Sequence, residues 1–262
     1  MPTSAPAIRF KSIHLPMQST VLMISGWSYG AGALAPLAQR LPGHMDSISL
    51  SAEEVLTSDR MDRFLRDDRQ YMLVGWSMGG MLALHWLARQ PNLFKAMVLV
   101  GSTAKFSSGD GHHDGVPKSR LRAMSLGLQR DPTDVLARFD RLAAEPHPVH
   151  PSVTEWRQAN EPSTDLDAKQ RDESLAAGLR FLSSSDFRPL LATVTVPTLI
   201  LHGEDDEVIP ARAATEMAHR IKDSHLEFRA QIGHDLPVRD PTWVAERIEQ
   251  FWTSDEADGN TD

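Results

Sequence analysis

Six short apolar runs alternate with helical patterns along this chain, and this alternation constrains the fold more than any other feature. Each run is four to six residues long, and most are rich in β-branched residues, as buried strands are. The runs cover residues 20–25, 45–50, 71–74, 96–100, 198–201 and 226–230. The helical patterns cover residues 32–40, 78–89, 211–222 and 241–252. The alternation predicts an α/β fold, with a mostly parallel central sheet flanked by helices.

The alternation stops between residues 105 and 190. This stretch opens with a Gly/Ser/Asp/His loop at 107–117 and continues with amphipathic helical patterns near 118–129, 132–144 and 168–183. The patterns are broken by Pro146, Pro148, Pro151 and Pro162. We interpret the stretch as a helical insertion over the carboxyl edge of the sheet, where α/β proteins bind ligands. The domains expected are a core of 1–104 and 191–252, a helical cap of 105–190 and a disordered tail of 253–262.

Composition narrows the classes of function. The chain has no cysteine, which excludes disulfides, thiolate metal sites and cysteine nucleophiles. Its net charge of −8 argues against general nucleic-acid binding. The first twenty residues hold no apolar run long enough for a signal peptide, and no run is long enough to cross a membrane. We therefore expect a soluble cytoplasmic protein that binds neither nucleic acid nor membrane.

A G-x-S-x-G pentapeptide, residues 75–79, supplies the candidate nucleophile, Ser77. An apolar run precedes it and a helical pattern follows it, which is the strand–turn–helix context that this motif needs. The flanking glycines let strand and helix approach closely, and the tight turn presents the hydroxyl above the sheet. A bare pentapeptide also occurs by chance as a solvated turn, so the prediction depends on this context.

The candidate base and acid follow the serine in the order that such a fold requires. After the run at 198–201, four acidic residues stand together at 204–207. Asp206 is chosen because it lies three residues after Gly203 and before an apolar Val-Ile-Pro; Asp205 is the alternative. After the run at 226–230 comes His234, which the preceding glycine allows to turn back toward the serine. The predicted triad is Ser77, His234 and Asp206.

Acyl transfer also needs donors for a developing oxyanion. One is the backbone N–H of Met78, directly after the nucleophile. The other is expected from the loop at 25–30, where the Trp27 N–H would face the oxyanion and its ring would line the acyl pocket. Trp27 is equally compatible with a plain core position.

A second histidine group, His112, His113 and Asp114, resembles a metal site only superficially. It lies in a glycine-rich loop without further clustered ligands, so we predict no metal. No organic cofactor is needed for the expected chemistry.

Taken together, Ser77, Asp206, His234 and the loop at 25–30 resemble the α/β-hydrolase superfamily over nearly the whole chain. Within it, the sequence is similar to the pimeloyl-ACP methyl ester esterases of biotin synthesis. The similar stretches are Gly26-Trp27, 74–80, 100–107, Arg138-Phe139, 178–191 and the loop around His234. Two positions depart from that family. Ser25 stands where that family usually has a histidine. The family's Asp-x-Pro-Gly-x-Gly-x-Ser run is replaced by residues 49–59, which reshapes a loop near the pocket.

The resemblance implies a serine carboxylesterase whose cap holds an acyl chain and docks acyl carrier protein. Carried over by position, Phe139 would line the acyl channel and Arg138 would contact the carrier or its phosphopantetheine. Residues 118–142 hold six basic and three acidic residues, which suits an acidic partner. A solvated helix face with internal ion pairs explains these charges equally well.

Other functions share these residues. A broad short-chain carboxylesterase or thioesterase is the nearest alternative. A haloperoxidase or a C–C-bond hydrolase would use the same triad. A non-catalytic ligand-binding protein of this fold is disfavoured because all three triad positions are filled.

Overall fold

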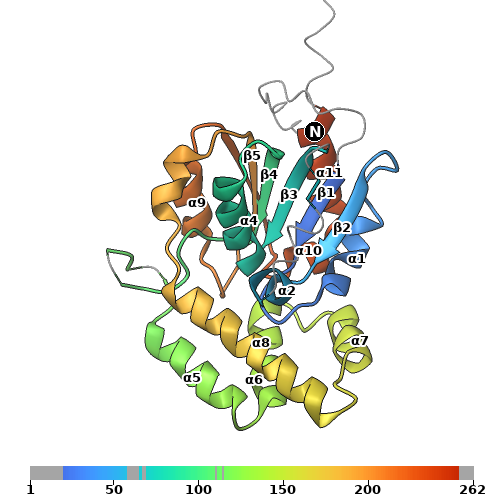
Figure 1. The fold of residues 1–262 in the computed structure, drawn as a ribbon, viewed down its shortest axis with the longest axis vertical. Helices are drawn as coiled ribbons and strands as arrows, with labels where there is room; N and C mark the ends of the chain where they lie inside the picture. Colours follow the sequence, from blue (N-terminus) through green and yellow to red (C-terminus); the bar gives the residue numbers. More distant parts are fainter. Residues whose placement is uncertain (1–19, 58–64, 67–68, 110, 114, 254–262) are drawn as a thin grey trace, which may run out of the picture.

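A single sheet of six parallel strands forms the centre of the molecule in the computed structural model, which describes residues 20–57, 65–66, 69–109, 111–113 and 115–253 (Figure 1). Its order is β2-β1-β3-β4-β5-β6, and every neighbouring pair is parallel. The strands are β1 (Thr20–Ile24), β2 (Asp46–Leu50), β3 (Tyr71–Trp76), β4 (Phe94–Val100), β5 (Thr198–Gly203) and β6 (Ser224–Arg229). The prediction of an α/β fold with a mostly parallel sheet is confirmed.

The strand order reverses its direction between β1 and β3. The chain moves outward from β1 to β2, then returns to β3 and proceeds the other way to β6. Because parallel crossovers are right-handed, connections that run in opposite directions lie on opposite faces of the sheet. Loops that leave the carboxyl ends of β1 and β3 therefore diverge, and the crevice between them is where such folds bind ligands.

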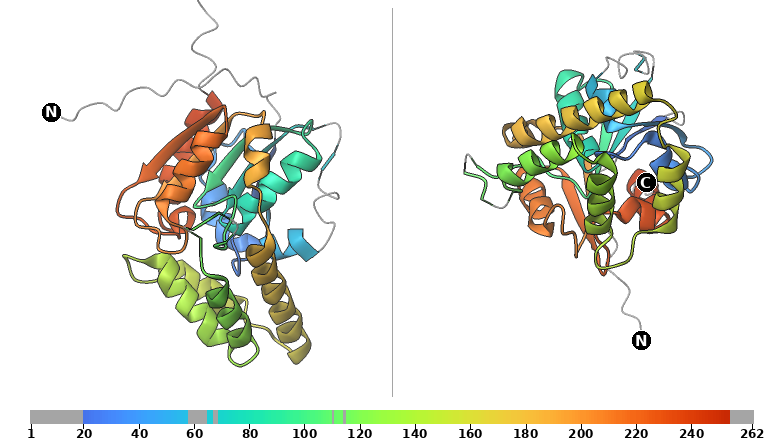
Figure 2. Two further views of the ribbon diagram at one scale, coloured as in Figure 1. Left: turned by 90° about the vertical axis from the view of Figure 1, so that its left-hand side faces the viewer. Right: turned by 90° about the horizontal axis from the view of Figure 1, so that it is seen from below.

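Helices cover both faces of the sheet (Figures 1 and 2). Helix α4 (Met78–Arg89) packs on β1, β3 and β4, and α9 (Ala211–Arg220) packs on β5 and β6. Helices α1 (Ala35–Ala38) and α11 (Pro241–Thr253) contact each other on the other face. The short elements are the 3-10 helices η1 (Ala31–Leu34) and η2 (Arg188–Thr193), with α2 (Ala52–Thr57) and α10 (Leu236–Arg239).

Four consecutive helices lie beyond the carboxyl end of the sheet (Figures 1 and 2). We call them the helical layer: α5 (Lys118–Leu128), α6 (Pro132–Ala144), α7 (Pro151–Ala159) and α8 (Asp165–Ser184). Helix α8 contacts α5 within the layer and α2 of the sheet region. The layer therefore stands over the crevice between β1 and β3.

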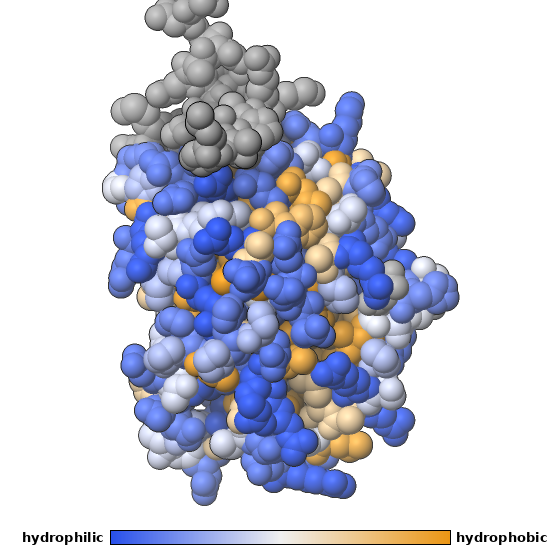
Figure 3. Space-filling model, turned by 180° about the vertical axis from the view of Figure 1, so that it is seen from behind, coloured by the Kyte–Doolittle hydropathy of each residue, from blue (hydrophilic) through white to orange (hydrophobic). Residues whose placement is uncertain are grey.

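The interior of the sheet is apolar and its edges are not. All residues of β1, β3 and β5 are buried, whereas β2 runs from exposed residues at its start to buried Leu50, and every residue of β6 is at least partly exposed. Such exposure is usual for edge strands. Seen from behind, the surface is mainly hydrophilic, with hydrophobic side chains gathered in separate patches (Figure 3). In the described ranges, no helix is long and apolar enough to cross a membrane.

The main difference from the predicted elements is α7. We expected Pro151 to interrupt helical structure, but it is the first residue of a nine-residue helix. Proline is tolerated there because the first helical N–H has no partner within the helix, and the His150 side chain caps the Ser152 N–H. Helix α8 also begins earlier than predicted, at Asp165, and Thr253 belongs to α11. The predicted tail from residue 254 onward lies outside the described residues.

Candidate active site

Ser77 occupies a sharp turn between β3 and α4. Its backbone has φ 56° and ψ −121°, a region that residues with a side chain rarely adopt. Two hydrogen bonds hold it there: its N–H donates to Val100 O at 2.9 Å, and the Ser102 hydroxyl donates to Ser77 O at 2.8 Å. A Cβ on Gly79 would lie 2.2 Å from Ile24 O, so only glycine permits α4 to start this close to β1. The local sequence thus forces the strained turn.

The structure brings the three predicted triad residues into one line of hydrogen bonds. His234, in the loop before α10, places Nε2 2.8 Å from Ser77 Oγ and Nδ1 2.8 Å from Asp206 Oδ2. All three residues are buried. The Trp76 indole N–H donates to His234 O at 3.0 Å, which fixes the histidine backbone against the turn. A serine hydroxyl bonded to an imidazole that is itself oriented by a carboxylate is the geometry of an activated nucleophile.

Asp206 is held as a carboxylate by its surroundings. Its Oδ1 accepts hydrogen bonds from the N–H groups of Val208 and Ile209, both at 2.8 Å. Burial alone would raise the pKa of Asp206, but His234 and His202 outweigh it and hold the pKa well below its ordinary value. Asp205, the alternative from the sequence, is exposed. Of the two neighbours, Asp206 is the one that reaches His234.

The loop after β1 lies against the serine, as its place in the sheet order requires. A Cβ on Gly26 would be 3.1 Å from Ser77 Cβ. The Trp27 ring is buried, and its indole N–H donates to Leu175 O of α8 at 2.9 Å. The backbone N–H groups of Trp27 and Met78 donate no turn or loop hydrogen bond to any other described residue.

A cavity of about 550 Å³ opens between Ser77 and the helical layer. Its wall is mainly apolar and includes Trp27, Phe139, Leu179, Leu182 and Val208. Phe139 meets the Trp27 ring edge-on at 5.0 Å between ring centroids and lies 6.4 Å from the His234 ring. Charged side chains also reach the cavity: Arg120, Asp134, Arg138, Arg141, Glu145 and Glu207.

Arg138 differs from Phe139 in exposure. Its side chain is 71% exposed and pairs with Asp134 one turn earlier on α6, at 2.8 Å. All six basic residues between 118 and 142 are exposed, whereas Asp140, one of the three acidic residues there, is buried. The exposed surface of residues 118–142 is therefore more basic than the sequence count suggests.

Sequence reasoning missed a polar cluster behind the site. Arg157 of α7 donates to both oxygens of Asp140 and to two oxygens of Ser28, and the Tyr29 hydroxyl donates to Asp140 Oδ1 at 3.1 Å. An ion pair between residues 17 positions apart in the sequence leaves no periodic signal. A hint was Tyr29, a polar aromatic residue within the loop at 25–30.

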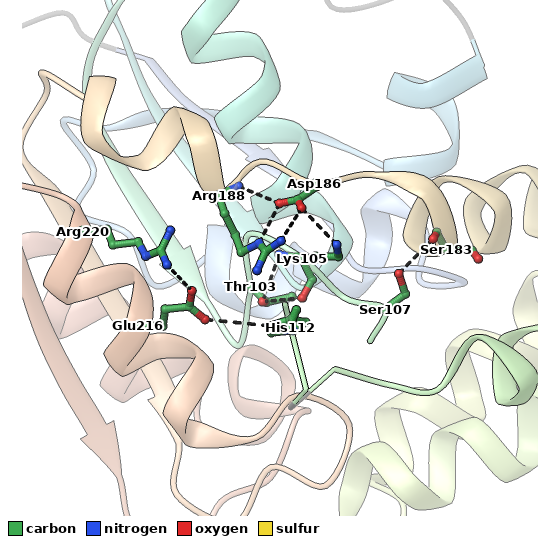
Figure 4. A network of polar contacts seen from close by, with 9 residues as sticks. All are labelled: Thr103, Lys105, Ser107, His112, Ser183, Asp186, Arg188, Glu216 and Arg220. Atoms are coloured by element: carbon green, nitrogen blue, oxygen red, sulfur yellow. Dashed lines mark hydrogen bonds and ion pairs between the residues drawn. The ribbon is translucent and has the colours of Figure 1, made fainter. Parts of the chain in front are cut away.

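The His112 loop belongs to a different network, at the base of the helical layer (Figure 4). His112 Nδ1 lies 4.0 Å from Glu216 Oε2, and Glu216 Oε1 pairs with Arg220. His113 is exposed. Within the described ranges, no three His, Asp or Glu side chains are grouped so as to hold a metal ion. Asp114, the third residue of the superficial metal motif, lies outside the described residues.

The two connections to the helical layer are joined in the same network (Figure 4). The Lys105 ammonium pairs with Asp186 at 3.0 Å, and Arg188 pairs with the same carboxylate at 2.7 Å. The Ser107 hydroxyl donates to Ser183 O at 2.9 Å. The chain thus leaves the sheet and returns to it through one cross-linked junction.

Comparison with known proteins agrees with this fold. Residues 59–241 match the family described as alpha/beta hydrolase fold, and the chain belongs to this family. It is 29% identical over 243 residues to the pimeloyl-[acyl-carrier protein] methyl ester esterase of Nitrosomonas europaea, covering 85% of this chain and 92% of that protein. The protein of the same name from Xanthomonas campestris pv. campestris (strain B100) is 27% identical over 246 residues, covering 88% and 94%.

Solved structures show the same architecture. An esterase from Exiguobacterium antarcticum superposes with a TM-score of 0.77 at 22% identity, covering 94% of this chain and 93% of that one. A bromoperoxidase from Bacillus anthracis gives 0.73 at 17% identity, with 93% and 92% covered. At these identities the likeness concerns the fold alone.

Proposed function

We propose that this chain is a serine carboxylesterase that hydrolyses an ester through an acyl-enzyme, with the methyl ester of pimeloyl-[acyl-carrier protein] as its substrate. The observation that carries the chemistry is the hydrogen-bonded line from Ser77 Oγ through His234 to Asp206, at 2.8 Å on each side of the imidazole. The names of the relatives, which match over most of their length, support the substrate.

The reaction begins with attack of Ser77 Oγ on the ester carbonyl while His234 Nε2 takes the hydroxyl proton. The oxyanion that forms accepts hydrogen bonds from the Trp27 and Met78 N–H groups. The tetrahedral intermediate expels methanol, which receives its proton from His234. Asp206 remains ionised and stabilises the imidazolium between the two transfers.

Deacylation repeats these steps with water. His234 takes a proton from water, the hydroxide attacks the acyl carbonyl, and Ser77 leaves with the proton returned by His234. The products are the free carboxylate and methanol. Each proton that the histidine accepts is given back, so the enzyme is regenerated without a cofactor.

The helical layer supports an acyl-carrier-linked substrate. The apolar wall formed by Phe139, Leu179 and Leu182 suits a methylene chain. The exposed basic residues of α5 and α6 suit docking of an acidic carrier, with Arg138 at the edge of the cavity.

Mass spectrometry of methyl pimeloyl-ACP after incubation with the protein tests this proposal. With wild type, we expect the mass of the acyl-ACP to fall by that of one CH2 group, as the methyl ester becomes a free acid. With Ser77→Ala, the mass should not change. If p-nitrophenyl esters are hydrolysed while the methyl pimeloyl-ACP mass is unchanged, the substrate is wrong and a broad carboxylesterase replaces it. If wild type hydrolyses neither, the esterase proposal itself fails.

A further inference from the structure

We propose that Arg157 is a positioning residue for the esterase reaction, because it holds and polarises the backbone loop that carries the Trp27 N–H. This inference rests on the proposed function, in which that N–H stabilises the oxyanion. Arg157 does not line the cavity that contains Ser77; it lies behind the loop, on α7.

All three polar atoms of Ser28, the residue after Trp27, are held by the side chains of Arg157 and Glu53. Arg157 Nη1 donates to Ser28 O at 2.6 Å, and Nη2 donates to Ser28 Oγ at 2.9 Å. The Ser28 N–H donates to Glu53 Oε1 at 2.6 Å. Ser28 has φ 68°, a left-handed conformation that a serine adopts only when its surroundings enforce it. The contacts of Arg157 and Glu53 with Ser28 enforce this conformation.

The grip on Ser28 reaches the Trp27 N–H through two peptide groups. The peptide that contains Ser28 O also contains the Tyr29 N–H, which donates to Gly26 O at 3.1 Å. The peptide that contains Gly26 O also contains the Trp27 N–H. A guanidinium at one end of such a chain orients each peptide plane and strengthens the next hydrogen bond. Its positive charge therefore makes the last N–H a better donor to an anion.

Arg157 is itself held rigidly enough to act as a fixed point. Its Nε and Nη2 donate to the two oxygens of Asp140 at 3.0 and 2.7 Å. Its guanidinium lies over the rings of Tyr29 and Trp156, at 5.1 and 5.2 Å from their centroids. Its side chain is only 18% exposed. Four hydrogen bonds and two stacked rings leave the guanidinium little freedom.

The cluster is also continuous with the serine side of the site. Tyr29 packs on Trp76 with ring centroids 4.6 Å apart, and Trp76 directly precedes Ser77. Phe139, next to Asp140 on α6, contacts Trp27. The helical layer thus sets the oxyanion loop and the nucleophile turn through one packed unit.

Steady-state hydrolysis of p-nitrophenyl butyrate by Arg157→Met and Arg157→Lys tests the proposal, with kcat expressed per active site titrated by the acylation burst. For Arg157→Met we expect kcat to fall by about 10- to 100-fold, less than the ~10²–10³-fold cost of deleting an oxyanion donor. KM should change by no more than about twofold, because the substrate ground state makes no charged contact with this loop. Arg157→Lys keeps the positive charge beside Asp140, so its kcat should lie between those of wild type and Arg157→Met.

A transition-state analogue separates positioning from mere stability. A trifluoromethyl ketone forms a tetrahedral adduct with the serine, so its inhibition constant should rise by about the factor by which kcat/KM falls. Arg229→Met is the matched control, since Arg229 also pairs with a carboxylate, that of Asp240 at 2.7 Å, and lies over a ring, that of Trp243 at 5.6 Å. It should lower thermal stability without changing kcat.

The outcomes are distinct. If both Arg157 variants keep the wild-type kcat and inhibitor affinity and lose only melting temperature, the positioning role is wrong and the proposed function stands. If Arg157→Met does not fold, Arg157→Lys decides by the same measurements. If wild type neither hydrolyses the ester nor binds the ketone, the proposed function fails and the inference fails with it.

Discussion

At the scale of single residues, the site depends on backbone positions that tolerate no substituent. A Cβ on Gly79 would meet Ile24 O at 2.2 Å and Ser25 O at 2.6 Å, and both are backbone atoms that have no room to move aside. The separation of α4 from β1, and with it the strained geometry of Ser77, therefore depends on this glycine.

We expect Gly79→Ala to destabilise the protein by about 1–3 kcal/mol, because the overlap must be relieved by moving the helix. The fraction of titratable serine should fall as well. Gly43→Ala is the control, since a Cβ there meets nothing within 4 Å. Thermal unfolding and active-site titration of both variants check this; an unchanged Gly79→Ala protein would show that α4 is free to shift.

Glu53 adds a pH dependence beside the loop that follows β1. Burial raises the pKa of Glu53 from 4.5 to about 7, against the hydrogen bond from Ser28, which lowers it. Between these two values the folded protein binds a proton that the unfolded chain has released, so this group makes stability fall as pH rises through that window. Above about pH 7 its effect is constant.

Glu53→Gln should remove this contribution while keeping an oxygen to accept the Ser28 N–H. The melting temperature of Glu53→Gln relative to wild type should therefore increase between about pH 5 and about pH 8. Scanning calorimetry at both ends of this range measures it. A constant or decreasing difference would contradict the raised pKa.

At the scale of elements, the junction of the helical layer is an ion pair network rather than an apolar hinge. The Arg188 hydrogen bonds hold the pKa of Asp186 far below its ordinary value, with Lys105 adding to them against partial burial. One carboxylate thus joins the segment after β4 to the segment after α8. Losing it would leave the buried Lys105 ammonium without this partner.

Asp186→Asn should lower the free energy of unfolding by about 1–3 kcal/mol, the usual range for a buried polar group that loses a partner. Hydrogen exchange in α5 to α8 should accelerate in this variant. Asp172→Asn is the matched control, because Asp172 pairs with its neighbour Arg171 within α8 and, in the part of the chain that the structure describes, has no ion pair with another element. Urea unfolding and exchange that are equal in the two variants would contradict a junction role.

The elements also show which parts of the fold the local sequence predicts and which it does not. Buried strands and the helices between them were predictable because each follows its own periodicity. The turn at Ser77 was predictable because its glycines, strand and helix are contiguous. Helix α7 was missed because Pro151 reads as a breaker unless its role as the first helical residue is known. Arg157 was missed with it: its partners are Ser28 and Asp140, and nothing local in the sequence indicates such a contact.

The contrast between local sequence and packing also applies to the residues of the candidate site. Asp206 was selected over Asp205 by spacing, and its burial against His234 depends on the Val208 and Ile209 N–H groups that fix the loop. The exposure of Arg138 and its pairing with Asp134 follow from how α6 packs, which helix periodicity alone did not specify. Local motifs therefore locate the candidate site, whereas packing decides which charged side chains face solvent.

At the scale of the whole molecule, charge is distributed unevenly. The chain carries a net charge of −8, yet the six basic residues of 118–142 are all exposed on the helical layer. Such a local field attracts an acidic partner even when the overall charge is negative, and its effect weakens as salt screens it.

If acyl carrier protein docks on this face, charge reversal away from the cavity should affect only the carrier-linked substrate. Arg122 and Arg130 are exposed and do not line the cavity. We expect the double variant Arg122→Glu, Arg130→Glu to lower kcat/KM for methyl pimeloyl-ACP by about tenfold or more at low salt, with less effect at high salt, because electrostatic steering acts on encounter. Hydrolysis of p-nitrophenyl butyrate should be unchanged.

Lys222→Glu is the control. Lys222 is exposed and lies before the amino end of β6, so it is at the end of the sheet opposite to the helical layer. Lys222→Glu changes the net charge by half as much as the double variant, so a loss from it about half as large in log kcat/KM would assign the effect to net charge and contradict docking on the helical layer.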